Sequence, residues 1–145
     1  MSNAQAQIIF VDDDPIALFL HDMIIRDCVP GASPHCFDQA EQALALLAAG
    51  DSCEKAFLIF LDINMPGMDG WTFLDALNKS NLRASTQVVM LTSSIEAADR
   101  QRAGSFDIVL DFLEKPFSQD QIAALGTRHS LDNFLQHGNE LKVPD

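Results

Sequence analysis

Five short apolar runs recur along the chain, and polar residues or turn formers bound each of them. Runs of this length that are rich in Ile, Val, Leu and Phe predict buried strands. They lie at 8–11, 35–37, 57–61, 87–92 and within 107–117. The third run leads directly into Asp62 and then into a loop that contains Pro66, Gly67 and Gly70. A carboxylate at the mouth of an apolar strand is costly unless it is paired, bound to a metal or used in chemistry.

Between these runs the apolar residues recur at helical spacing, which predicts connecting helices. Asp14 before Pro15 predicts the start of a helix over 15–27, because Asp is a favoured N-cap and Pro suits the first helical position. We expect the apolar positions of this helix to face the core. They are Ile16, Leu18, Phe19, Leu20, Met23, Ile24 and Ile25.

Four further helices are predicted along the rest of the chain. Their starts lie near Asp38, Gly70, Ser94 and Ser118. Two of them carry the spacing of a capping box, in which the N-cap residue and the residue three positions later satisfy each other's backbone N–H groups. These pairs are Asp38 with Glu41 and Ser118 with Gln121.

Strands that alternate with helices of this length predict an α/β fold, with right-handed βαβ units and a doubly wound parallel sheet covered on both faces. In such sheets the residues at the carboxyl ends of the strands line the crevice where ligands bind. The residues that end the strong strands are therefore expected to converge on one edge. They are Asp12, Asp13, Asp62, Thr92 and Lys115.

This set of side chains is suited to phosphate chemistry with a metal. Crowded carboxylates repel one another, and Mg²⁺ relieves that repulsion while it also binds phosphate oxygens. Lys115 and Thr92 supply a positive charge and a hydroxyl donor for a phosphoryl group. Asp62 stands alone at its strand end and is the candidate nucleophile, since carboxylates form aspartyl-phosphates. The backbone carbonyl of Asn64 is a candidate metal ligand.

Each of these residues also has an ordinary structural interpretation. Asp62 could cap the following loop, and acids at 12–14 favour a helix N-terminus. Lys115 taken alone reads as a surface lysine, and Thr92 as a strand former. Only their common register at the strand ends favours the functional interpretation.

Composition narrows the partners. The chain has 145 residues, 48% of them apolar, which suits one globular domain. A formal charge of -12 opposes direct binding to nucleic acid and to anionic lipid. No stretch of the sequence has enough consecutive apolar residues to span a membrane. The cysteines Cys28, Cys36 and Cys53 lack close CxxC spacing, so we expect buried, reduced thiols and a cytoplasmic location.

The motifs VDDDP, FLDINMPGMDG, VVMLTSS and FLEKPF, in this order, resemble those of two-component response-regulator receiver domains, of the CheY-like, single-domain type. The resemblance spans residues 8–117. It implies a flavodoxin-like sheet with strand order 2-1-3-4-5. It also implies a receiver domain over 5–126, followed by an extended last helix and tail over 127–145.

The resemblance also implies a role for each matching residue. Asp62 matches the phospho-acceptor, and the Mg²⁺ ligand set is Asp12, Asp13, Asp62 and the carbonyl of Asn64. Lys115 matches the lysine that pairs with the phosphoryl oxygens and precedes a cis peptide. Thr92 and Phe112 match the switch pair, and Ser94 a position that tunes dephosphorylation. The segment 102–112 departs from the family by carrying Phe106 where a short polar turn is usual, which predicts an unusual switch surface.

By this likeness the partners are a histidine kinase or phosphotransfer protein and a downstream protein target, with the domain monomeric or dimeric on phosphorylation. The first helix could dock the kinase through Ile16, Phe19 and Leu20, although a core position is favoured. Two alternatives stay open. One is a phosphorylation-silent interaction module, and the other is a small phosphatase, which would need an acid at Asn64 as general acid. The receiver interpretation makes the chain a signalling domain rather than an enzyme.

Overall fold

A computed structural model describes residues 5–65, 67–93 and 96–129. Five parallel strands form one sheet in the order β2-β1-β3-β4-β5. The strands are β1 (Gln5–Val11), β2 (His35–Phe37), β3 (Lys55–Asp62), β4 (Ser85–Thr92) and β5 (Val109–Glu114). The helices are α1 (Pro15–Cys28), α2 (Ala40–Ala49), α3 (Gly70–Ser80), α4 (Ala97–Ala103) and α5 (Gln119–His129). The predicted fold class and strand order are confirmed.

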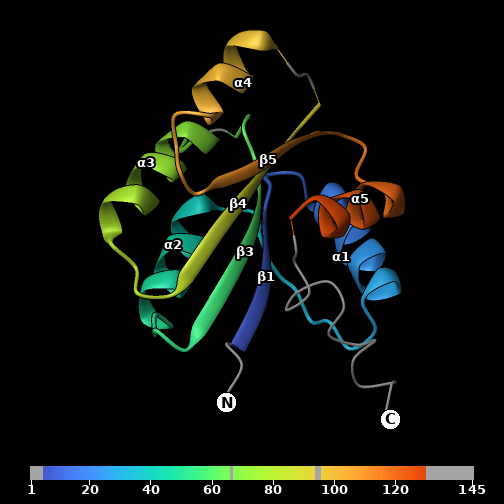
Figure 1. The fold of residues 1–145 in the computed structure, drawn as a ribbon, viewed down its shortest axis with the longest axis horizontal. Helices are drawn as coiled ribbons and strands as arrows, with labels where there is room; N and C mark the ends of the chain where they lie inside the picture. The colour runs from blue at the N-terminus through green and yellow to red at the C-terminus, as the bar shows by residue number, and fades with distance from the viewer. Residues whose placement is uncertain (1–4, 66, 94–95, 130–145) are drawn as a thin grey trace.

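The sheet is buried on both faces, with α1 and α5 on one side and α2 and α3 on the other (Figure 1). Successive residues of β3 alternate between the two cores, because side chains of a strand point to opposite faces. Ile59 and Leu61 pack toward α2 and α3, whereas Leu58 and Phe60 pack toward α1 and α5. The apolar run at 57–61 is therefore continuous because both faces are covered.

Local capping explains where most helices begin. The Asp14 side chain accepts a hydrogen bond from the Ile16 N–H at 3.0 Å, as predicted. At the start of α5, the Ser118 N–H donates to Gln121 Oε1 at 3.1 Å and the Gln121 N–H donates to Ser118 Oγ at 3.2 Å, which confirms that capping box.

The capping box predicted at the start of α2 is wrong. This helix begins at Ala40 with Gln39 as its N-cap, and the cap makes no side-chain hydrogen bond. Asp38 lies one position too early because β2 ends at Phe37 and the chain needs two residues to turn into the helix. The two acidic residues therefore do not reach the helix N–H groups in the predicted pairing.

The core interpretation of α1 is wrong for much of its apolar surface. Ile16 is 71% exposed, Phe19 64%, Leu20 50% and Met23 52%. Only Leu18, His21 and Ile25 are buried in this helix. A helix that packs on a sheet buries one stripe, and α1 carries more apolar residues than that stripe can hold.

The cysteine prediction is also corrected. Cys36 and Cys53 are exposed and Cys28 is half-buried, and all three are free thiols. Cys36 lies on β2, which is three residues long and forms the edge of the sheet, so its side chain has less cover than a central strand would give.

Some predictions fall outside the described residues. Ser94 is one of them, and so is most of the segment 127–145, since the description ends at His129. Within the described part of the chain, every helix is too short or too polar to cross a membrane.

Candidate functional site

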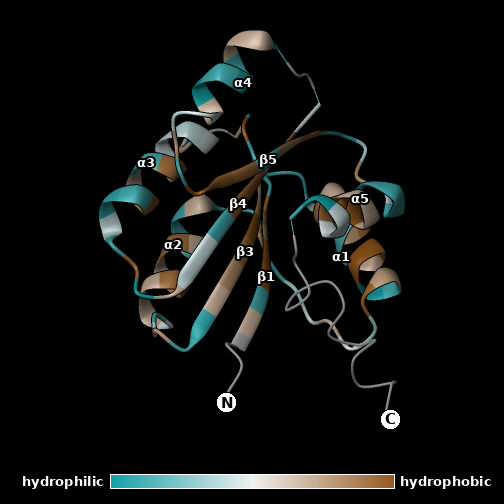
Figure 2. Ribbon diagram, viewed as in Figure 1, coloured by the Kyte–Doolittle hydropathy of each residue, from teal (hydrophilic) through white to brown (hydrophobic). Residues whose placement is uncertain are grey.

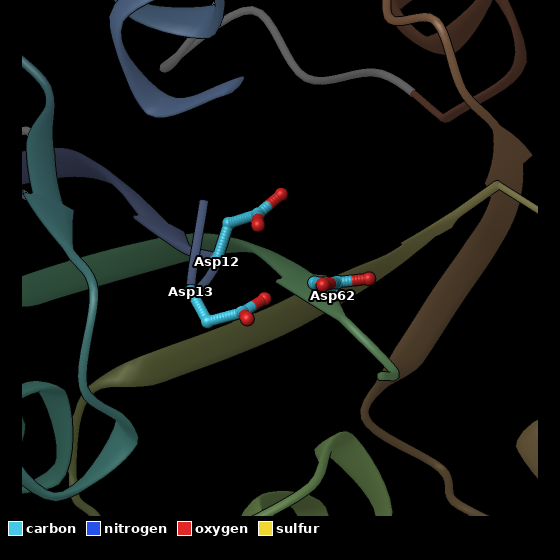
Figure 3. Close-up of side chains that lie close together, drawn as sticks. All are labelled: Asp12, Asp13 and Asp62. Atoms are coloured by element: carbon cyan, nitrogen blue, oxygen red, sulfur yellow. The ribbon is translucent and has the colours of Figure 1, made fainter. Parts of the chain in front are cut away.

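Three carboxylates gather at the carboxyl edge of the sheet, as the sequence predicted. Asp12 and Asp13 follow β1, and Asp62 ends β3, its neighbour in the sheet. One carboxylate oxygen from each residue lies within 4.8 Å of the others. Figure 3 shows the three side chains side by side at the ends of the two strands. Asp12 and Asp62 are buried and Asp13 is exposed, so the cluster opens to solvent on the Asp13 side.

Lys115 joins this cluster from the end of β5. Its Nζ donates to Asp12 Oδ2 at 2.6 Å and lies 3.6 Å from Asp62 Oδ1. Its backbone N–H donates to the carbonyl of Thr92 at 2.7 Å, which fixes the lysine beside the end of β4. The peptide bond between Lys115 and Pro116 is cis, as the resemblance implied.

The site perturbs its own ionisation. Burial, and then the negative charge of Asp12, raise the pKa of Asp62 to about 6, while the Lys115 charge opposes that rise. Burial alone would lower the pKa of Lys115, but the hydrogen bond to Asp12 and the charges of Asp12 and Asp62 raise it above its usual value. Lys115 is therefore protonated at neutral pH. Ionisation of Asp62 is unfavourable, and a cation bound nearby would lower its cost.

A close approach of the backbone shapes the loop after Asp62. The Gly70 N–H donates to the carbonyl of Ile63 at 2.9 Å. A Cβ at position 70 would lie 2.8 Å from both the carbonyl oxygen of Asp62 and the Cα of Ile63. Since those atoms are backbone and cannot move aside, only glycine lets α3 begin this close to Asp62.

The two residues of the predicted switch pair lie on adjacent strands. Thr92 is fully buried at the end of β4, in register with Glu114 of β5. Phe112 lies two positions earlier on β5, opposite Met90, and is 8% exposed. Asn64 is exposed in the loop after β3, and its N–H lies 3.4 Å from Asp62 Oδ1. The structure thus brings all five strand-end residues to one edge, and Phe112 lies further from that edge, level with Met90 on the neighbouring strand.

Sequence reasoning missed two neighbours of this site. Arg100 of α4 stacks over the Phe112 ring, with its Cζ 5.6 Å from the ring centroid. His21 of α1 is buried against Phe10 and Phe117, and its Nδ1 has no hydrogen-bond partner. Burial lowers the pKa of His21 to about 4, against the opposing charge of Asp12. The spacing of His21 three residues after Leu18 and four before Ile25 was the available signal for its burial.

The donor set fits a small hard cation. Three carboxylates offer oxygen ligands of the kind that Mg²⁺ prefers, and their mutual repulsion would fall on binding. The cluster contains no imidazole or thiolate, the ligands that favour zinc. With Lys115 alongside, the edge can neutralise the oxygens of a phosphoryl group.

Comparisons with known proteins agree with this geometry. The chain is 30% identical over 128 residues to the cyclic di-GMP phosphodiesterase RocR of Pseudomonas aeruginosa, an alignment that covers 85% of this chain and 31% of RocR. It therefore spans less than a third of that relative's length.

Two solved structures share the fold. A two-component response regulator from Cytophaga hutchinsonii has a TM-score of 0.72 and 28% identity, covering 87% of this chain and 97% of that one. A CheY-like receiver domain from Methanospirillum hungatei has a TM-score of 0.66 and 27% identity, covering 93% and 98%. The family model described as the response regulator receiver domain matches residues 8–125. Because this match takes in β2 to β5, β1 from residue 8 onward and every residue of the acidic edge, the chain belongs to the response regulator receiver domain family.

Proposed function

We propose that Asp62 accepts a phosphoryl group from a phosphohistidine on a sensor kinase or phosphotransfer protein. A carboxylate oxygen of Asp62 attacks phosphorus in line, the phosphorus–nitrogen bond breaks, and the donor imidazole leaves with the bonding electron pair. The product is a mixed anhydride, which water later hydrolyses to Asp62 and inorganic phosphate. The observation that carries this proposal is the position of Lys115 Nζ, 3.6 Å from Asp62 Oδ1 inside the acidic cluster.

Each neighbouring residue has a part in this reaction. Lys115 offers its charge to the phosphoryl oxygens, and its pairing with Asp12 holds the amine at the edge. Thr92 provides a hydroxyl for the phosphorylated state, and Phe112 follows it as the switch aromatic. Asp12, Asp13, Asp62 and the carbonyl of Asn64 would hold Mg²⁺, which supplies charge neutralisation for the transferring group.

The exposed face of α1 is the proposed docking surface for the donor. Ile16, Phe19, Leu20 and Met23 form this α1 surface, and each is at least 50% exposed. Neighbouring exposed apolar residues of this kind mark an interaction site. The α1 surface starts four residues after Asp12, so a helix bundle that docks on it would carry its phosphohistidine close to Asp62.

The proposed output is a changed protein surface around α4, β5 and α5, read by a downstream protein target. The chain then acts as a cytoplasmic signalling domain, monomeric or dimeric on phosphorylation. A small phosphatase is disfavoured because Asn64 stands where a general acid is required and an amide cannot supply the proton.

Intact-mass spectrometry after incubation with acetyl phosphate and Mg²⁺ tests the proposal. We expect one phosphoryl adduct on the wild type, no adduct on Asp62→Asn and none in the presence of a chelator. Asp69→Asn is the matched control, because Asp69 is a nearby carboxylate that caps α3 instead of facing the cluster. The absence of an adduct on the wild type, with acetyl phosphate and with a panel of kinases, would favour the phosphorylation-silent interaction module.

A further inference from the structure

Helix α4 is attached to the domain by unusually little apolar burial. It is 7 residues long, and Ala103 is its one buried residue. The side chain of its N-cap residue, Glu96, makes no capping hydrogen bond. Among the described helices, each of the other four buries at least two residues. Figure 2 shows hydrophilic residues along much of α4, in contrast to the brown strands below it. A helix this short is not stable by itself, so other contacts must hold it in place.

Two arginine side chains supply those contacts. The Cζ of Arg100 lies 5.6 Å from the centroid of the Phe112 ring, and the Cζ of Arg102 lies 4.6 Å from the Trp71 ring. Both distances are within the range of a cation–π interaction. Residues two positions apart on a helix point in different directions, so the two arginines reach two different partners. One partner ring belongs to β5 and the other to α3.

Both rings are buried and both are linked to the acidic edge. Trp71 is 7% exposed and directly follows Gly70, whose N–H closes the loop from Asp62. It also stacks on Phe106, the residue that departs from the family pattern, with 6.4 Å between ring centroids. Phe112 is 8% exposed and lies three residues before Lys115 on the strand that carries the lysine to the cluster.

We propose that Arg100 and Arg102 form a two-point clamp that holds α4 on Phe112 and Trp71, with Arg100 as a positioning residue for the switch aromatic. Detachment of α4 then uncovers both rings together, so the position of Phe112 and the docking of α4 form one equilibrium. The clamp itself is a property of the unphosphorylated protein. Its response to phosphorylation rests on the proposed function.

The charges around the clamp define what else could hold α4. Asp69, the N-cap of α3, attracts Arg102 electrostatically. Asp111, which precedes Phe112, is already paired with Arg128 and His129 of α5. An ion pair between exposed groups weakens in salt, whereas a stacked guanidinium depends on the ring beneath it. The test must therefore separate charge from stacking.

The first experiment uses Trp71, the single tryptophan in the chain, as an optical reporter. We expect Arg102→Gln to increase acrylamide quenching of its fluorescence, and both Arg100→Gln and Arg102→Gln to accelerate hydrogen exchange at the α4 amides by about fivefold. The amides of Arg100 and Gly104 report directly, since they donate to the carbonyls of Glu96 and Arg100.

Matched variants show whether charge alone is responsible. Arg26→Gln removes the same charge from an exposed ion pair on α1 and should leave α4 exchange unchanged. Arg100→Lys and Arg102→Lys keep the charge but lose the planar guanidinium, so they should restore only part of the protection, whereas full restoration would show that charge alone holds α4. If the two contacts act as one clamp, the double variant costs less than the sum of the single variants. Wild-type exchange rates in both glutamine variants, with circular dichroism also unchanged, would overturn the clamp.

A phosphorylated sample tests the coupling separately. Where mass spectrometry confirms the adduct, we expect quenching of Trp71 to change on phosphorylation in the wild type, and the change to shrink at least twofold in Arg100→Gln. An equal change in both proteins would show that the switch bypasses Arg100. Absence of an adduct would count against the proposed function, and the exchange data on unphosphorylated protein would still decide the clamp.

Discussion

Helices α1 and α4 both follow strands that end at the same edge of the sheet. In each helix, the environment of some side chains is the opposite of what their hydropathy predicts. In α1, large apolar side chains such as Ile16 and Phe19 are exposed to solvent. In α4, charged side chains are packed on aromatic rings, through Arg100 and Arg102. The contrast is visible in Figure 2, where brown residues are present along α1 and teal residues along α4.

The difference indicates two kinds of functional surface. Helix α1 is anchored by Leu18 and Ile25 and can display a second apolar face without losing its place, which suits a partner that binds and leaves. Helix α4 has almost no apolar anchor, which suits an element that moves when the site changes. Under the proposed function, the docking surface for the donor therefore lies on a well-anchored helix, and the helix proposed to change has few apolar contacts.

The largest expected effect comes from truncating a buried side chain that anchors α1. Leu18→Ala should lower the free energy of unfolding by about 2–5 kcal/mol, because Leu18 is buried in the core shared with α5. Phe19→Ala, one residue later but 64% exposed, should change it by less than about 0.5 kcal/mol. Urea denaturation at neutral pH measures both. Equal losses would mean that Phe19 is packed in solution and that the exposed α1 surface does not exist.

A buried histidine makes the packing of α1 dependent on pH. Folding lowers the pKa of His21 from 6.5 to about 4, chiefly through burial. As the pH falls, His21 therefore binds a proton in the unfolded chain before it does so in the folded protein. Stability is consequently lost between about pH 6.5 and pH 4. His21→Leu should abolish this pH-dependent loss, and it also removes the buried Nδ1 that has no hydrogen-bond partner. The free energy of unfolding at pH 5 should therefore rise by about 1–3 kcal/mol. A gain that is no larger at pH 5 than at pH 7.5 would contradict the neutral, buried imidazole.

The α1 surface should matter for transfer from a protein donor and not for a small donor. We expect Phe19→Ser with Leu20→Ser to slow phosphotransfer from a kinase or phosphotransfer protein about tenfold, since few interface residues carry most of the binding energy. The rate with acetyl phosphate should stay unchanged. Asn78→Asp, on α3, is a control that alters a surface far from α1. Equal slowing with both donors would place the defect in the site rather than in docking.

The smallest expected effect concerns the ionisation of Asp62 in the acidic cluster. The folded state raises the pKa of Asp62 from 3.8 to about 6, chiefly through burial, so its ionised form is unfavourable above pH 6 and this cost disappears as the pH falls toward 3.8. Asp62→Asn should therefore stabilise the metal-free protein by about 1 kcal/mol at pH 7.5, a figure reduced for partial solvent screening. The gain should vanish near pH 4. Denaturation curves with a chelator present measure it, and destabilisation at pH 7.5 would show that the Lys115 charge outweighs burial.

The features that depend only on short stretches of chain could be predicted from the amino-acid sequence. The apolar runs fixed the strands, and Asp14 with Pro15 and Ser118 with Gln121 fixed two helix starts. The alternation of strands and helices then placed Asp12, Asp62 and Lys115 at one edge, because parallel strands end on the same side of a sheet. Periodicity and topology carry this information without any long-range detail.

The exposure of α1, the contacts of α4 and the ionisation of the site could not be predicted from the sequence. The exposure of Phe19 depends on how much of α1 the sheet and α5 cover. Because the helix has apolar residues on more than one face, its sequence pattern cannot show which face is buried. The stacking of Arg102 on Trp71 joins residues from separate helices, and the pKa of Asp62 depends on the depth of burial and on the distance to Asp12. These quantities are distances between groups far apart in the chain, so they exist only once the chain has packed.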